Sequence, residues 1–118
     1  MSKTLQDLFN AAWERAKTPV KAVEPGQKVC LYRPGHNIPP CFIGVLIPDE
    51  KYHEKMEGLR GYDPVIRRAA DIHDDVDVIH IVGLQGIHDH CDPEEWERLL
   101  RDYAKKYHLT IPGEQPSA

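Results

Sequence analysis

Apolar residues recur at helical spacing near both ends of the chain. The first stretch begins after Thr4, with Asp7 three residues later in an arrangement typical of a capping box. The second begins after Asp92-Pro93, with Glu95 in the corresponding position. One apolar stripe holds Leu5, Leu8, Phe9, Ala12 and Ala16, and the other holds Trp96, Leu99, Leu100, Tyr103, Ala104 and Tyr107. The pattern therefore predicts a helix at each end.

The region around residues 29–46 has a different pattern. Residues 29–32 form a short run of β type, and residues 33–40 contain three prolines and a glycine, which favours a turn or loop. The apolar run 41–47 that follows either returns as a hairpin partner or leads into a helix, because periodicity does not decide between them. We predict a short two-stranded β-hairpin here.

Three further helices are expected between these regions. Residues 48–56 and 64–70 each begin with a proline beside an acidic residue, which suits a first helical turn. The β-branched residues of 76–89 favour a strand, but a length of about 14 residues favours a buried helix. We predict an α+β fold, predominantly helical, with about five helices and the hairpin. Residues 1–111 would form one globular domain and residues 112–118 a flexible tail.

Composition and charge narrow the classes of partner. The chain has 118 residues, of which 41% are hydrophobic and 29% charged, as in ordinary globular domains. A net charge of -4 disfavours binding to DNA or to an anionic membrane surface. No apolar run approaches the ~20 residues of a membrane span, and residues 1–16 lack an apolar signal core. We expect a cytoplasmic protein with no nucleic-acid or membrane partner, whose three cysteines are thiols.

The cysteines and histidines suggest three kinds of chemistry. Cys30 and Cys41 are too far apart in sequence for a usual zinc-ligand pair, although His88, His90 and Cys91 are close together. We predict no metal ligands and no cofactor. Two His-Asp pairs, 73–74 and 88–89, occur in a chain too short for the helical bundle of a metal-dependent phosphohydrolase.

Nucleophilic catalysis would need an activated thiol, a histidine and an orienting group. Cys41 and His88 are the weak catalytic candidates. Asp89 is not expected to orient His88, because neighbouring helical residues point about 100° apart. Whether the chain is an enzyme stays open at this point.

Five polar residues stand beside apolar segments, not within charged runs, and form the candidate binding set: Arg33, Asp49, Glu57, His88 and Asp89. Burying such groups unpaired would cost several kcal/mol, so we expect them to pair. We predict that Arg33 lies close to at least one of Asp49, Glu57 or Asp89, with His88 nearby. The set would serve either as a structural network or as a binding site.

The sequence also carries a recognisable series of short motifs, namely CLYR at 30–33, CFIGVLIPDE at 41–50, Tyr52, MEG at 56–58, LQGIHD at 84–89 and Trp96. Over roughly residues 30–109 the chain resembles a group of small uncharacterised proteins encoded in phage and bacterial genomes. The resemblance implies a phage-type accessory protein and carries no known activity.

Because no catalytic set is assembled, the first hypothesis is a protein that acts by binding a protein partner. Inhibition of a host process would fit the phage setting. The alternative is a small hydrolase or transferase based on Cys41 and His88. The oligomeric state is not predicted.

Overall fold

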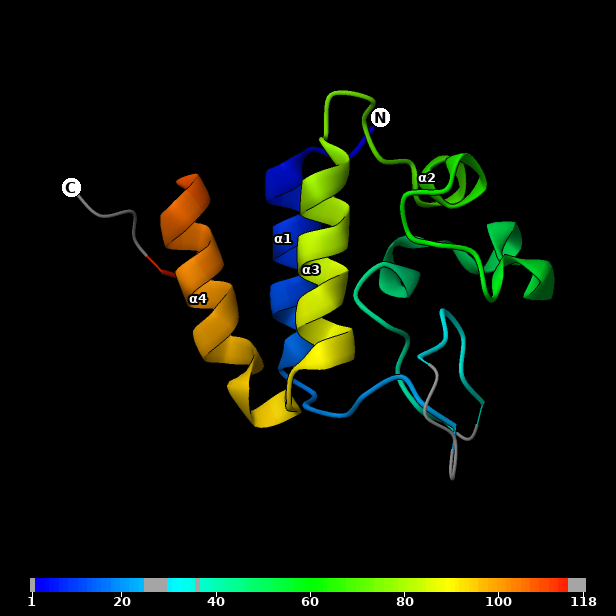
Figure 1. Cartoon of the computed structure of the whole chain (residues 1–118), viewed down its shortest axis with the longest axis horizontal. Helices are drawn as coiled ribbons and strands as arrows, with labels where there is room; N and C mark the ends of the chain where they lie inside the picture. The colour runs from blue at the N-terminus through cyan, green and yellow to red at the C-terminus, as the bar shows by residue number, and fades with distance from the viewer. Residues whose placement is uncertain (1, 25–29, 36, 115–118) are drawn as a thin grey trace.

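Four α-helices dominate the computed structural model, which describes residues 2–24, 30–35 and 37–114. Their bounds are α1 (Leu5–Ala16), α2 (Pro64–Ala70), α3 (Val78–His90) and α4 (Trp96–Tyr107). Helices α1, α3 and α4 pack against one another, whereas α2 and the irregular segments lie on the other side of α3 (Figure 1). Within the described ranges the only β pairing consists of two isolated bridges, Lys3 with Ile72 and Val23 with Cys30.

The predicted hairpin is therefore wrong, and the fold is mostly helical instead of α+β. Residues 41–47 are largely buried, as an apolar run should be, but their backbone turns through a 3-10 helix at Gly44–Leu46. A side chain at Gly44 would lie 2.8 Å from the Cα atom of Tyr32, so the two segments meet by close packing and not by strand pairing. Residue 29, the first of the predicted first strand, lies outside the described residues.

The prediction of five helices is wrong because residues 48–56 form no continuous helix. Two short 3-10 helices, Asp49–Lys51 and Glu54–Met56, are separated by two residues with extended backbone. By contrast, helix formation over 64–70 is confirmed, with Asp63 accepting a hydrogen bond from the amide of Val65. Helix α3 confirms the choice of helix over strand for 76–89, and Asp77 caps its first turn.

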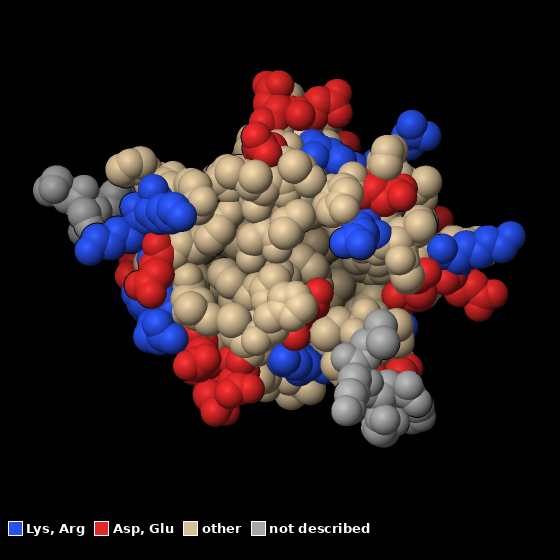
Figure 2. Space-filling view, in the orientation of Figure 1, with Lys and Arg blue, Asp and Glu red and all other residues tan. Residues whose placement is uncertain are grey.

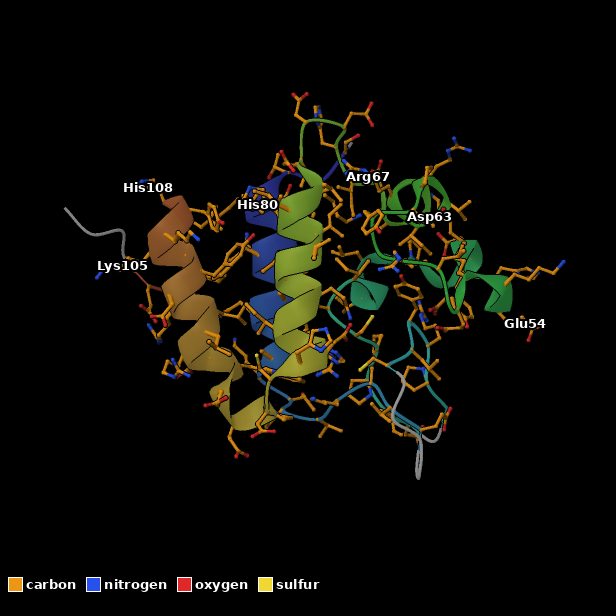
Figure 3. The ribbon with its side chains drawn as sticks, viewed as in Figure 1. Glu54, Asp63, Arg67, His80, Lys105 and His108 are labelled. Carbon is orange, nitrogen blue, oxygen red and sulfur yellow. The ribbon has the colours of Figure 1, made fainter. Side chains whose placement is uncertain are left out.

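The two terminal helices are confirmed, although their starts differ. Thr4 and Asp7 form the full capping box before α1. Before α4 the chain first makes a 3-10 helix, Pro93–Glu95, and Asp92 makes no side-chain capping bond. Where α3 begins, Nδ1 of His80 lies 2.6 Å from the hydroxyl of Tyr103, which ties α3 to α4 (Figure 3).

Buried side chains from both ends and from the middle of the chain form one cluster. Trp96, Leu100 and Ala104 of α4 are buried in it, as are Ile81 and Leu84 of α3. No helix in the described parts of the chain is long and apolar enough to cross a membrane. Of the predicted tail, residues 112–114 are described, and residues 115–118 lie outside the described residues.

Candidate functional site

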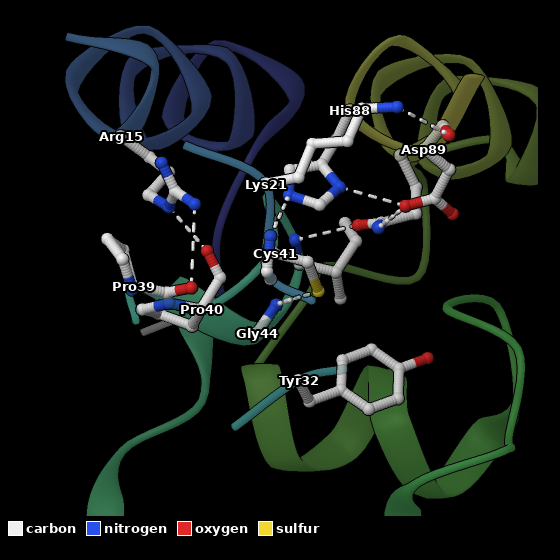
Figure 4. Close-up of polar contacts among 12 residues, drawn as sticks. Arg15, Lys21, Tyr32, Pro39, Pro40, Cys41, Gly44, His88 and Asp89 are labelled. Carbon is white, nitrogen blue, oxygen red and sulfur yellow. Dashed lines mark hydrogen bonds and ion pairs between the residues drawn. The ribbon is translucent and has the colours of Figure 1, made fainter. Parts of the chain in front are cut away.

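The C-terminal turn of α3 carries a polar cluster centred on His88 and Asp89 (Figure 4). His88 is completely buried. Its ring packs against two aromatic rings, with centroid distances of 5.2 Å to Phe42 and 5.0 Å to Trp96. A charged imidazolium would be costly in such surroundings, and burial accordingly lowers the pKa of His88.

The hydrogen bonds of His88 define which ring nitrogen carries the proton. The backbone amide of Ala22, which can only donate, lies 3.1 Å from Nε2. Nε2 must therefore be the unprotonated acceptor, and the proton of the neutral ring is on Nδ1. That nitrogen lies 2.9 Å from Oδ1 of Asp89 and donates to it. His88 thus joins the segment that follows α1 to the end of α3.

The expectation that Asp89 would not orient His88 is wrong. The two side chains meet at the last turn of α3, although the residues are neighbours on the helix. Oδ1 of Asp89 also accepts from Nε2 of Gln85, at 2.7 Å. Gln85 is itself oriented, because its Oε1 accepts from the amide of Ile43 at 3.0 Å.

Asp89 stays ionised in this environment. Burial alone would raise the pKa of its carboxyl, but hydrogen bonds from His88, Gln85 and Cys30 outweigh that effect and leave the pKa lowered. The effect on Cys30 is the opposite. Burial and the neighbouring Asp89 carboxylate raise the pKa of the Cys30 thiol to about 12, so it remains protonated.

Cys30, His88 and Asp89 place one ligand atom each within 4.8 Å of one another, the spacing of a metal site. The hydrogen bonds do not fit that use. A metal on Nδ1 of neutral His88 would move the ring proton to Nε2, where it would face the amide proton of Ala22. The same protonation prevents Nδ1 from accepting a proton from Cys30. The cluster is thus suited to holding a carboxylate in place, and not to metal binding or thiol activation.

Cys41, the predicted nucleophile, is a buried thiol. Its side chain is 2% exposed, and Sγ accepts a hydrogen bond from the amide of Gly44 at 3.2 Å. Burial raises its pKa to about 12, which leaves almost no thiolate at neutral pH. No hydrogen bond joins Cys41 to His88 in the described residues. This geometry gives no support to a catalytic role for the pair.

Arg33, Asp49 and Glu57 form a second cluster, which confirms that Arg33 lies close to a carboxylate but not that His88 lies nearby. Nη1 of Arg33 pairs with Asp49, and Nη2 donates to the carbonyl of Ile47. Glu57 accepts from the amide of Arg33 at 3.0 Å and from the hydroxyl of Tyr52 at 2.8 Å. These contacts hold residues 32–33 against the two 3-10 helices. No hydrogen bond or ion pair in the described part of the chain joins this cluster to His88 or Asp89, so the predicted set divides in two.

Arg15 is a buried charge that the sequence analysis did not identify. It is 6% exposed, and its guanidinium donates to four backbone carbonyls, those of Thr18, Val20, Pro39 and Pro40. It also lies over the ring of Trp96, 5.6 Å from the centroid. The acceptors of Arg15 are backbone carbonyls and not a carboxylate, so the sequence contains no acidic partner from which its burial could be predicted. Arg15 fastens the proline-rich loop to α1.

A pocket of about 350 Å³ opens beside the His88–Asp89 cluster. Its walls are the outer side of α3 and residues 58–62, and Tyr32 and both Cys30 and Cys41 contribute to its lining. Gln85, Asp89 and His90 are the polar residues of α3 that line it. The pocket size lies within the range of small ligand sites. Comparison of the chain with protein-family models, curated proteins and solved structures finds no match.

Proposed function

We propose that this chain acts by binding a protein partner through an exposed apolar face of α3. That face, the apolar α3 face, consists of Val78, Ile79 and Val82, whose exposed fractions are 40%, 56% and 51%. This exposure is the observation that carries the proposal. Tyr62 is also exposed, and it lines the same pocket as Val82.

The fold itself does not need apolar residues at these positions. The core-facing side of α3 is already supplied by Ile81, Leu84 and His88, at the spacing of one helical face. β-Branched residues form helices less readily than the charged residues that usually occupy an exposed face. Figure 2 shows uncharged surface over the middle of this side of the molecule, with most acidic and basic side chains round its edge. An apolar centre with a polar rim is the usual arrangement of a protein interface.

The charges near the apolar α3 face favour a protein as its occupant. Asp74, Asp75 and Asp77 lie immediately before α3, and the whole chain has a net charge of -4. Anionic membranes and nucleic acids attract basic surfaces, so neither is the expected ligand. The resemblance to phage-encoded proteins leads us to propose a bacterial host protein as the partner and inhibition of a host process as the effect, in the cytoplasm.

The test uses affinity capture from host lysate with three matched baits. They are the parent chain, the double variant Ile79→Asp/Val82→Asp, and a control, Val20→Asp. Val20 has a similar exposed fraction, 47%, but lies in the segment after α1. We expect a protein that is captured by the parent chain and by the control, and lost with the double variant. Circular dichroism of all three baits establishes that they are folded.

The mass of the purified chain in solution supplies the second measurement. A dimer of the parent chain that the double variant converts to a monomer would assign the apolar α3 face to a second copy of this protein. If both aspartate variants capture the same proteins as the parent, the face does not mediate binding and the proposal fails.

A further inference from the structure

We propose that Asp89 binds a lysine or arginine side chain of the partner, which enters the pocket between α3 and residues 58–62. This inference rests on the proposed function, because it specifies the chemistry of the partner at a site beside the apolar α3 face. Val82 belongs both to that face and to the lining of the pocket. A partner segment that covers the apolar α3 face can therefore place one side chain in the pocket.

The carboxylate is held before any ligand arrives. The hydrogen bonds from Nδ1 of His88, at 2.9 Å, and from Nε2 of Gln85, at 2.7 Å, end on the same oxygen, Oδ1, and the Cys30 thiol also donates to this carboxylate. His88 and Gln85 are fixed in turn by the backbone amides of Ala22 and Ile43. Since the side chain of Asp89 remains 30% exposed, part of the carboxylate is accessible from the pocket. A preorganised ionised group of this kind loses little freedom when a cation binds.

The remaining lining suits the stem of a long basic side chain. Leu59, Ile81 and Val82 offer apolar surface, and Tyr32 adds an aromatic ring. Lysine and arginine carry a charged end on an apolar stem, so they match a pocket with apolar walls and one carboxylate. A volume of about 350 Å³ leaves room for one such side chain.

Lys21, Arg60 and His90 are the basic residues of the chain near the pocket, and none of them has a hydrogen bond or ion pair with the Asp89 carboxylate in the described residues. Nζ of Lys21 donates to the backbone carbonyl of Asp89, at 3.2 Å, and not to its carboxylate. Arg60 lines the pocket, and its guanidinium makes no hydrogen bond or ion pair with the described residues. The positive charge of Arg60 should weaken binding of a cation, so Arg60→Gln is expected to strengthen it.

The experiment is an NMR titration with two probes, N-acetyl-arginine methylamide and its neutral counterpart N-acetyl-citrulline methylamide. The amide signals of Gly58, Gly61 and Gly86 report on the pocket. We expect saturable shifts with the arginine probe, with a dissociation constant in the millimolar range, as befits a ligand of this size. The dissociation constant should be at least about tenfold larger for the citrulline probe with the parent chain, and for the arginine probe with the Asp89→Asn variant.

Equal binding of arginine and citrulline by the parent chain would overturn the inference, whatever the stability of Asp89→Asn. No response to arginine would do the same. The Val78→Asp/Ile79→Asp variant separates this result from the proposed function, because neither residue lines the pocket, so it should lose the partner while still binding the arginine probe. Loss of the partner without any arginine site in the parent would retain the proposed function and refute the role of Asp89.

Discussion

Helices α3 and α4 are similar in length but differ in how fully the fold explains them. In α4, Trp96, Leu100 and Ala104 are buried, and its outward positions carry charged residues, several of them in ion pairs such as Arg98 with Asp102. In α3 the inward side is buried in the same way, but the exposed residues of its first half, Val78, Ile79 and Val82, are apolar. Packing in the core explains where the apolar residues of α4 lie, but it explains only the buried apolar residues of α3 and not the exposed ones. We interpret these exposed residues as selected for contact with another molecule.

The largest expected effect concerns the buried side of α4. Trp96 is completely buried and contacts Phe42, His88 and Arg15, so Trp96→Ala should lower the free energy of unfolding by about 3–5 kcal/mol. Urea unfolding followed by circular dichroism measures this, with Arg98→Ala as an exposed control on the same helix. A loss no larger than that of the control would mean that α4 is peripheral to the core.

The helices were the part of the fold that could be predicted from the sequence. α1 and α4 have strong apolar stripes and recognisable first turns, so their existence followed from spacing alone. The run 41–47 has no such period, and its burial is compatible with either a strand or a turn. What decided the outcome was the close approach of Gly44 to the backbone of Tyr32. This contact joins segments 12 residues apart, and no local pattern reports it.

The candidate site was predictable to a similar, partial degree. Gln85 and Asp89 are four residues apart on one helix, so their hydrogen bond could have been derived from helical spacing. That Arg33 would lie close to a carboxylate was predicted from charges placed beside apolar runs, and in the structure it pairs with Asp49. Which ring nitrogen of His88 carries the proton could not be predicted from the sequence, because it is decided by the backbone amide of Ala22, 66 residues away. Almost every residue has a backbone amide, so the type of residue does not show which amide will be the partner.

A smaller effect on the free energy of unfolding is expected for the Arg33 cluster. Its size shows whether polar residues outside the helices stabilise the fold. Arg33→Ala removes the pair with Asp49 and the bond to the carbonyl of Ile47. Because the pair is partly exposed, we expect a loss of about 1–2 kcal/mol in the free energy of unfolding. Arg98→Ala, which breaks only surface pairs, should cost less than about 0.5 kcal/mol. Unchanged stability combined with lost partner capture would move Arg33 to the binding surface.

The buried end of α3 should give a dependence of stability on pH. Burial lowers the pKa of His88 in the folded chain below its value in the unfolded chain, about 6.5. The unfolded state therefore takes up a proton first, and the stability from neutral His88 is complete above about pH 6.5 and decreases as the pH falls below it. Protonation would also set Nε2–H against the amide of Ala22. Urea unfolding between about pH 5 and 8 measures the slope.

Nitrogen NMR of the His88 ring provides the control for that measurement. At neutral pH it should show the proton on Nδ1 and a bare Nε2. Protonated Nε2 in the neutral ring would contradict the assigned hydrogen bond and remove the structural basis of the slope.

The smallest expected effect on stability belongs to the apolar α3 face itself. Ile79 and Val82 are more than half exposed, so the Ile79→Ser/Val82→Ser variant should change the free energy of unfolding by no more than about 1 kcal/mol, the sum of two surface substitutions. Ile81→Ala, at the buried position between them, should cost about 2–5 kcal/mol. Serine is used because it removes apolar area without adding charge. If the outward variant proved as costly as Ile81→Ala, these residues would be packing inside the monomer, and the contrast between α3 and α4 would no longer indicate a binding surface.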